Sequence, residues 1–111
     1  MMSIFNKYLL SRDNLLKRRI LIDSSLYRQL DELSEIYDAS VNRLVNLAII
    51  DFLEDGTLGA YKTAPNEISE GHNFTIRESS YQKLLTLKEK TGIPVCKLIN
   101  MSIYHTLHVK S

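Results

Sequence analysis

The chain has 111 residues, of which 44% are hydrophobic and 24% are charged, and its formal net charge is +1. This composition is typical of a folded chain, and the length allows one domain or two small units that share a core. Cys96 is the only cysteine, which excludes an intrachain disulfide and a four-cysteine zinc site. With no secretory signal and no apolar run near the ~20 residues that cross a bilayer, we expect a cytoplasmic protein with no membrane partner.

Residues 1–16 are predicted to form an N-terminal arm or a short helix. Their apolar residues have helix-like spacing, but the polar segment 11–14 interrupts it. Positive charge is concentrated in the first nineteen residues, whereas the stretch from Asp31 to Asp55 is acidic. The first basic residues are Lys7, Arg12, Lys17, Arg18 and Arg19.

Residues 17–55 predict one short strand followed by two helices. In the strand, Ile20 and Ile22 alternate with Arg19 and Leu21, as a period of two requires. Asp23 is a candidate N-cap for an amphipathic helix that ends near Asp38, and Ser40 is a candidate N-cap for a second helix closed by Gly56. The expected apolar faces are Leu26, Leu30, Leu33 and Tyr37 in the first helix, and Val41, Leu44, Val45, Ala48, Ile49 and Phe52 in the second.

Residues 56–71 contain glycine and proline and predict an irregular linker, and residues 72–108 repeat the strand–helix–helix plan. In the second strand Phe74 and Ile76 are expected to face inward, with Asn73, Thr75 and Arg77 outward. Thr91 and Gly92 mark the break between the helices. Pro94 suits the first turn of the last one, whose face is Val95, Leu98, Ile99, Ser102 and Ile103.

The two strand–helix–helix segments are copies of each other in sequence. Residues 20–53 align with residues 74–107 without a gap, and about a third of the positions are identical. We therefore expect Tyr27 and Tyr81, which match, to pack where the copies meet. The identical pairs are Ile22/Ile76, Ser25/Ser79, Tyr27/Tyr81, Leu30/Leu84, Leu33/Leu87, Glu35/Glu89, Val41/Val95, Leu44/Leu98, Asn46/Asn100, Ile49/Ile103 and Leu53/Leu107.

The segments RRILIDSSLYRQLDELSEIYDASVNRLVNLAIIDFLEDG and HNFTIRESSYQKLLTLKEKTGIPVCKLINMSIYHTL resemble the ribbon-helix-helix family, which includes Arc, MetJ and CopG. Members of that family dimerise, because one copy exposes a strand edge and an apolar face. Two copies on one chain resemble the TraY-like arrangement. The resemblance implies a mainly α fold with a short two-stranded antiparallel β-ribbon: a tandem ribbon-helix-helix pseudo-dimer whose repeats, 17–55 and 72–108, share one core.

The resemblance also implies a double-stranded DNA partner, with the ribbon in the major groove. The outward residues that would then contact bases are Lys17, Arg19, Leu21, Asn73 and Thr75, with Gly71 at the remaining outward position. Leu21 and Gly71 differ from the polar residues that the family usually has at the outward positions of its ribbon. We expect Lys17 and Arg19 to read one end of a site, and Asn73 and Thr75 the other. The expected phosphate contacts are Arg18, Ser40, Val41, Arg77 and Val95.

Two functional classes follow from these patterns. The first is a sequence-specific DNA-binding protein, acting as a transcriptional repressor or as a plasmid or phage accessory factor, with possible self-association on DNA. The second is a protein-interaction module, antitoxin-like or an assembly adaptor, that keeps the same fold. No catalytic motif is present, so we do not expect an enzyme or a cofactor. Cys96, His105 and His108 lack a fourth ligand and a known metal spacing, so no metal site is expected.

Overall fold

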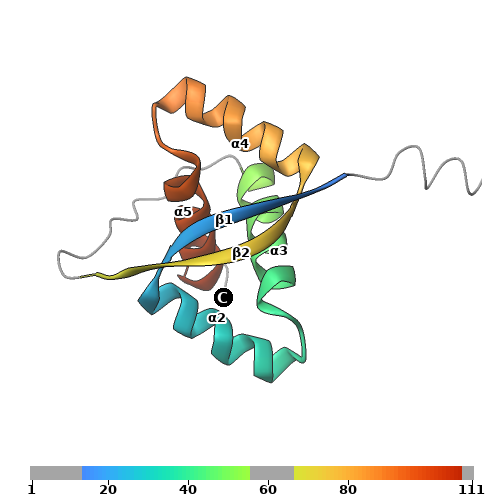
Figure 1. Cartoon of the computed structure of the whole chain (residues 1–111), viewed down its shortest axis with the longest axis vertical. Coiled ribbons are helices and arrows are strands. Elements are labelled where there is room, and N and C mark those ends of the chain that lie inside the picture. Colours follow the sequence, from blue (N-terminus) through green and yellow to red (C-terminus); the bar gives the residue numbers. More distant parts are fainter. Residues whose placement is uncertain (1–13, 56–66, 109–111) are drawn as a thin grey trace, which may run out of the picture.

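The computed structural model of the protein describes residues 14–55 and 67–108. Within them the chain is mainly helical with one two-stranded antiparallel sheet, as predicted (Figure 1). Most of the predicted arm and linker, together with Gly56 and Lys7, lies outside the described residues. The elements in chain order are β1 (Leu15–Asp23), α2 (Ser24–Tyr37), α3 (Val41–Asp55), β2 (Ser69–Arg77), α4 (Glu78–Thr91) and α5 (Val95–His108).

Both strands are longer than the sequence pattern predicts. β1 begins at Leu15, within the segment expected to be an arm, and β2 begins at Ser69, within the expected linker. The strands pair along their whole length, from Leu15 opposite Arg77 to Asp23 opposite Ser69. This pairing supplies backbone partners to residues whose own sequence shows no strand-like alternation. We call the paired strands the ribbon.

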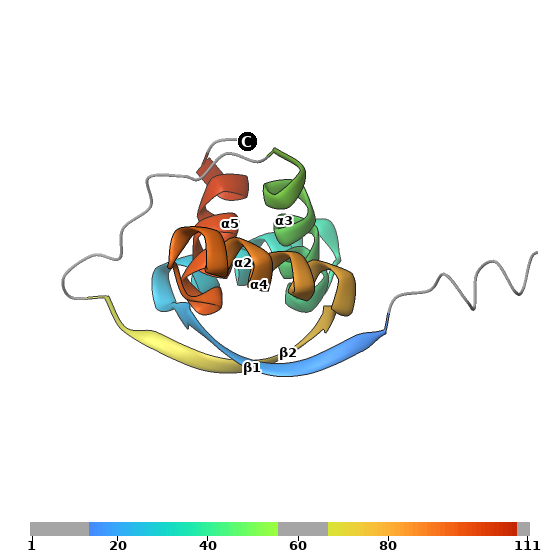
Figure 2. The ribbon, with the colours of Figure 1, turned by 90° about the horizontal axis from the view of Figure 1, so that it is seen from above.

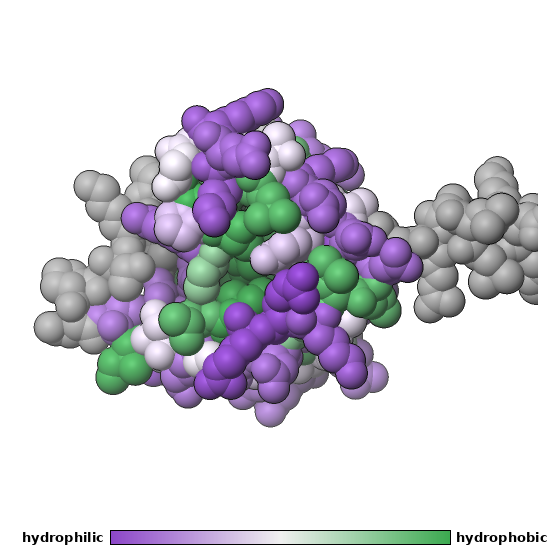
Figure 3. All heavy atoms as spheres, turned by 45° about the horizontal axis from the view of Figure 1, so that its top comes forward, coloured by the Kyte–Doolittle hydropathy of each residue, from purple (hydrophilic) through white to green (hydrophobic). Residues whose placement is uncertain are grey.

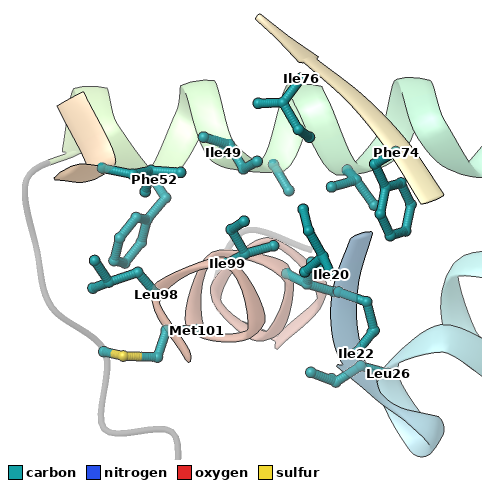
Figure 4. Close-up of a cluster of buried hydrophobic side chains, with 14 of the residues drawn as sticks. Ile20, Ile22, Leu26, Ile49, Phe52, Phe74, Ile76, Leu98, Ile99 and Met101 are labelled. Carbon is teal, nitrogen blue, oxygen red and sulfur yellow. The ribbon is translucent and has the colours of Figure 1, made fainter. Parts of the chain in front are cut away.

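The inner face of the ribbon covers the core. Ile20 and Ile22 of β1 and Phe74 and Ile76 of β2 are buried, which confirms the predicted alternation. Seen from above, the ribbon curves along one side of the molecule, and α3 and α5 stand over its inner face (Figure 2). Side chains from both helices and both strands point into one cluster (Figure 4). Its buried members are Ile20, Ile22, Leu26, Leu30, Val45, Ala48, Ile49, Phe52, Phe74, Ile76, Leu84, Leu98, Ile99, Met101 and Ile103.

Asparagine side chains from α3 and α5 bind the outer edges of the ribbon. Asn100 of α5 accepts a hydrogen bond from Asp23 N and donates one to Leu21 O, both at 2.9 Å. Asn46 of α3 makes the matching contacts on β2, with Arg77 N at 3.3 Å and Thr75 O at 2.8 Å. Unpaired strand edges invite association with other strands, so these side chains also protect the ribbon.

The start of α2 differs from the prediction that Asp23 caps it. Asp23 occupies the N-cap position, but its side chain makes no capping bond and instead accepts a hydrogen bond from Ser69 Oγ at 2.8 Å. The carboxylate of Glu67 lies at the N-terminus of α2. It accepts hydrogen bonds from Ser24 Oγ at 2.8 Å, from Ser25 Oγ at 2.6 Å and from Ser25 N at 3.3 Å. Pairing with β2 therefore brings the cap from a distant segment.

The other helix ends follow the sequence more closely. Ser40 caps α3 as predicted, since its hydroxyl accepts from Arg43 N at 3.1 Å. Asp38 and Gly92 end α2 and α4 in the left-handed region, at φ values of 51° and 77°. Pro94 precedes α5 rather than lying in its first turn, and its carbonyl accepts from Leu98 N at 3.0 Å.

Five residues of the predicted apolar faces are less buried than expected: Tyr37 is exposed, and Leu33, Val41, Leu44 and Val95 are only partly buried. Tyr37 is 67% exposed, because α2 ends there and no other element of the described chain covers it. Leu44 is only half-buried, whereas its counterpart Leu98 is fully buried. None of the helices in residues 14–55 and 67–108 is both long and apolar enough to cross a membrane.

Candidate nucleic-acid interface

The outer face of the ribbon brings together the six residues that the sequence places outward. Lys17 lies opposite Thr75, Arg19 opposite Asn73 and Leu21 opposite Gly71, so they form three cross-strand pairs. Side chains on alternate residues of a strand share a face, and the inward neighbours of these residues fill the core. Lys17, Arg19, Leu21 and Asn73 are exposed, and Thr75 and Gly71 are half-exposed.

This pairing corrects the predicted division of the ribbon into two ends. Lys17 and Arg19 were expected at one end, with Asn73 and Thr75 at the other, but the antiparallel register makes them direct neighbours. Polar side chains therefore occupy the centre of the ribbon and the end with Lys17 and Thr75. The opposite end carries Leu21 and Gly71, which offer no polar side-chain atom.

The glycine at that end has a steric role. The guanidinium group of Arg19 lies over Gly71, and a Cβ atom at residue 71 would be 2.5 Å from Arg19 Nη2. Real Cβ atoms do not approach other heavy atoms this closely, so a larger residue would displace the side chain. Gly71 thus leaves room for Arg19 to reach across the ribbon.

Arg18 lies on the inner side of the ribbon, toward the helices. Its guanidinium carbon is 5.0 Å from the centre of the Tyr81 ring, a cation–π distance, and its Nη1 donates to Lys17 O at 2.9 Å. The matching position on β2 is His72, whose ring stacks on Tyr27 at 3.8 Å. Each tyrosine therefore contacts the strand of the other half, as expected for residues packed where the copies meet.

The N-termini of α3 and α5 lie beside opposite ends of the ribbon. Asn42, in the first turn of α3, exchanges two hydrogen bonds with the backbone of Thr75, at 2.8 Å and 3.2 Å. Cys96, in the first turn of α5, donates from Sγ to Leu21 O at 2.9 Å. Ser40, Val41 and Val95 are thus held next to the ribbon. Helix N-termini favour anions through free N–H groups and the helix dipole.

Basic groups and polar hydrogen-bonding groups line a shallow hollow on the ribbon. It has a volume of about 460 Å³ and is lined by Lys17, Arg18, Arg19, Asn73, Phe74 and Thr75. In the space-filling view the most hydrophilic side chains form a band over this side of the molecule (Figure 3). Arg77, the remaining predicted phosphate contact, is exposed at the end of β2 and lines a smaller hollow beside α3 and α4.

The sequence interpretation did not find the residues that hold the ribbon in place. Asn42, Asn46, Asn100 and Cys96 fix the backbone at Thr75 and Leu21. The identity of Asn46 and Asn100 in the aligned copies was the available signal, because a polar residue kept on the apolar face of two helices needs a buried partner. The pairing strand could not be identified from that signal alone.

The side chains considered for a metal site have other contacts. Cys96 bonds to Leu21 O, and burial raises the pKa of its thiol, which remains a neutral donor. His105 Nε2 lies 3.0 Å from Asp55 Oδ2. Among the residues that the structure describes, no group of three or more His, Cys, Asp or Glu side chains could hold a metal ion.

A second surface feature lies away from the outer face of the ribbon. An open groove of about 590 Å³ runs between α2, α3 and α5, with mostly apolar walls that include Leu33, Leu47 and Leu107. Glu32 and Asp51 also line it. The groove has the character of a protein-binding surface more than of a nucleic-acid site.

Comparison with known proteins adds no further information. No protein-family model, no curated protein and no solved structure matches this chain. The functional interpretation therefore depends on the residues and their geometry.

Proposed function

We propose that the protein binds double-stranded DNA in a sequence-specific manner by inserting the ribbon into the major groove. The observation that carries this proposal is the outer face of the ribbon, where Lys17, Arg19, Asn73 and Thr75 lie together between two helix N-termini. A two-stranded ribbon fits the major groove, and alternate side chains then face the base edges.

We also propose that the chain is a tandem ribbon-helix-helix pseudo-dimer. Contacts that match at an offset of 54 positions support this interpretation: Asn46 and Asn100 bind strand edges in the same way, and Ser24 N and Glu78 N donate to Ile68 O and Asn14 O. Each second helix holds the strand of the other half. A chain built in this way supplies in cis the partner that a single copy would need.

The side chains on the ribbon have the chemistry for reading bases. Arg19 has the planar donor geometry that pairs with O6 and N7 of guanine, and Asn73 can bond with N6 and N7 of adenine. Thr75 and Leu21 carry methyl groups that fit against a thymine methyl. Backbone N–H groups at Val41 and Val95, with Arg18 and Arg77 nearby, would contact phosphates and fix the orientation of the ribbon.

The role that fits this surface is that of a transcriptional repressor or of an accessory factor on a plasmid or phage. Such a protein needs a rigid reading surface and no catalytic site. The ribbon meets this need, because its inner face is buried and its outer edges are bound by α3 and α5.

The dependence of duplex binding on salt tests the proposal. Phosphate contacts release counterions, so the logarithm of the affinity should fall with the logarithm of salt by about 0.9 per phosphate contacted. Arg18→Ala combined with Arg77→Ala, which removes two proposed phosphate contacts, should weaken binding to all sequences and reduce that slope. Lys88→Ala combined with Lys90→Ala removes the same charge from α4, away from the ribbon, and should keep the slope.

The apolar groove supports a second candidate function, a protein-interaction module of the antitoxin or adaptor type. Its apolar walls with Glu32 and Asp51 would suit a basic amphipathic helix of a partner. The same binding experiment separates the two functions. An interaction module should show no salt-dependent affinity for random-sequence duplex, and Leu47→Asp in the groove would then impair partner binding.

A further inference from the structure

The groove between α2, α3 and α5 is open, although residues that match its walls in the other half of the molecule are buried. The offset of 54 positions pairs the half-buried Leu44 with Leu98, which is fully buried. It also pairs Leu47, which is 51% exposed, with Met101, which is 4% exposed. The two halves therefore differ in how far this place is filled.

A phenylalanine helps to fill the matching place. Phe52 points from α3 into the buried cluster (Figure 4). Its ring lies edge-on to the ring of His105, with 6.1 Å between the centroids. The residues that match Phe52 and His105 are Thr106 and Asp51, and both line the groove. Because threonine has no ring, the groove leaves room for an apolar ring beside Thr106.

The hydroxyl group of Thr106 makes no hydrogen bond in the described part of the chain. Its Oγ1 atom is buried and has no partner. Threonines of α4 behave differently, since Thr86 and Thr91 donate to the carbonyl four residues earlier, at 3.1 Å and 2.8 Å. Buried polar atoms in folded proteins nearly always have a partner. Thr106 thus places a hydrogen-bonding group without a partner at the groove.

Acidic and aromatic side chains determine the charge that the groove would accept. Glu32 and Asp51 line it, and its described walls include no basic residue. Tyr37 adds a ring that is 67% exposed, and the faces of such rings attract cations. The matching residues of the other half are Thr86, His105 and Thr91. The open half alone therefore combines apolar walls with groups that favour a positive charge.

We propose that this groove binds a small organic cation, an amine that carries an aromatic or other apolar ring. The ring would lie beside Thr106, and the amine would pair with Asp51 and Glu32. The volume of about 590 Å³ lies within the roughly 300–1,000 Å³ of small-molecule sites. A partner helix about 10 Å wide would fill it with only about one and a half turns. The site lies away from the outer face of the ribbon, so it does not rest on the proposed function.

Three compounds with one apolar body test the preference for a cation. 4-Phenylbutylamine, 4-phenylbutanol and 4-phenylbutyrate have the same ring and chain but carry a positive charge, no charge and a negative charge. We would titrate each into the full chain without DNA and follow the backbone amide signals by NMR. The amine should bind about tenfold more tightly than the alcohol, because hydrogen bonds to charged groups are the stronger ones, and the acid should bind most weakly. The signals that shift should belong to α2, α3 and α5.

Two variants with matched controls locate the site. Thr106→Phe copies the filled half, so it should abolish binding without lowering the melting temperature. Thr86→Phe adds the same ring on the exposed surface of α4 and should leave binding unchanged. Leu47→Lys places a positive charge on the exposed wall, so it should weaken binding of the amine and strengthen binding of the acid. Ile68→Lys adds that charge at another exposed apolar residue and should change neither.

Equal affinities for the three compounds would overturn the inference, as would amine binding that survives Leu47→Lys unchanged. If Thr106→Phe did not fold, Leu47→Lys would decide alone, because residue 47 is exposed and tolerates lysine. A groove that binds a basic amphipathic peptide but not the amine would belong to a protein partner instead. A chain that binds the amine with the expected preference but binds no duplex would support the inference and contradict the proposed function.

Discussion

The guanidinium group of Arg19 lies so close over Gly71 that a Cβ atom there would approach its Nη2 to 2.5 Å. Gly71→Ala should therefore displace Arg19 from the surface of the ribbon. The displaced atoms are the end of a flexible side chain, so the free energy of unfolding should change by no more than about 0.5 kcal/mol. Under the proposed function, base selectivity at the position assigned to Arg19 should change, which selection of bound duplexes would measure.

Gly92 provides a matched glycine for comparison. It ends α4 at a φ of 77°, with nothing within 4 Å of the position a Cβ would take. Gly92→Ala should cost about 1 kcal/mol of stability through backbone strain and leave base selectivity unchanged. If Gly71→Ala also lowered stability and left base selectivity unchanged, as expected for Gly92→Ala, the space over Gly71 would have no part in reading DNA.

Replacing Asn46 or Asn100 with alanine should destabilise the whole fold. Each change leaves a backbone N–H and a carbonyl at the edge of the ribbon without their asparagine partner, which costs about 1–3 kcal/mol. Unfolding in urea would measure the loss, and the two variants should lose similar amounts because their contacts match. Asn73→Ala, on the exposed outer face, should change stability by less than about 0.5 kcal/mol.

The sequence contained enough information for the elements and for the faces of the ribbon. Alternation of Ile20 and Ile22 with charged or exposed neighbours has a period of two, and such a pattern reports local geometry directly. The gapless alignment of residues 20–53 with residues 74–107, which includes the pair Asn46 and Asn100, indicated the duplication. The break between helices at Gly92 could also be predicted from the sequence, because glycine takes a positive φ at no steric cost.

Features that depend on the pairing of distant segments could not be predicted from the sequence. Glu67 caps α2 across the ribbon in place of Asp23, and no local pattern connects Glu67 with Ser25. The register that places Arg19 opposite Asn73 likewise depends on the length of strand pairing beyond the alternating residues. Local chemistry therefore identified the candidate site residues, while the antiparallel register determined which of them are neighbours.

The stability of the protein should fall in acid in a way that depends on Glu67. Hydrogen bonds from the side chains of Ser25 and Ser24 hold the pKa of the Glu67 carboxyl below its usual value of 4.5. A lowered pKa in the folded state stabilises the fold fully above the unfolded-state pKa, and this contribution is lost as the pH falls through the folded-state pKa. Melting temperatures measured from about pH 6 to pH 3 should therefore decline less steeply in Glu67→Gln than in the wild type. Glu70→Gln removes a neighbouring exposed acid and is the control, and equal slopes in both variants would contradict this role for Glu67.

Leu98→Ala and Leu44→Ala should have unequal costs although the residues match in the two copies. Leu98 is fully buried in α5, so its truncation should cost about 2–5 kcal/mol. Leu44 is half-buried on the wall of the groove, and its truncation should cost less because part of its surface already meets solvent. Thermal melts of the two variants would measure the difference, and equal losses would show that the exposed groove is covered in solution.

If the ribbon binds DNA as we propose, the preferred DNA site should be asymmetric along the ribbon. Homodimeric ribbons present two identical strands and favour palindromic sites, whereas here Lys17 and Thr75 mark one end and Leu21 and Gly71 the other. The first end and the part of the ribbon that the Arg19 guanidinium covers, from the centre to Gly71, should show strong base preferences, whereas Leu21 should add only a weak one. Because Arg19 and Asn73 are direct neighbours, Arg19→Ala and Asn73→Ala should relax adjacent base pairs near the centre, at a cost of about 1–3 kcal/mol for Arg19. Selection from a random duplex pool with the wild type and both variants would measure this. A palindromic consensus, or variants that relax positions at opposite ends of the site, would contradict this orientation of the ribbon.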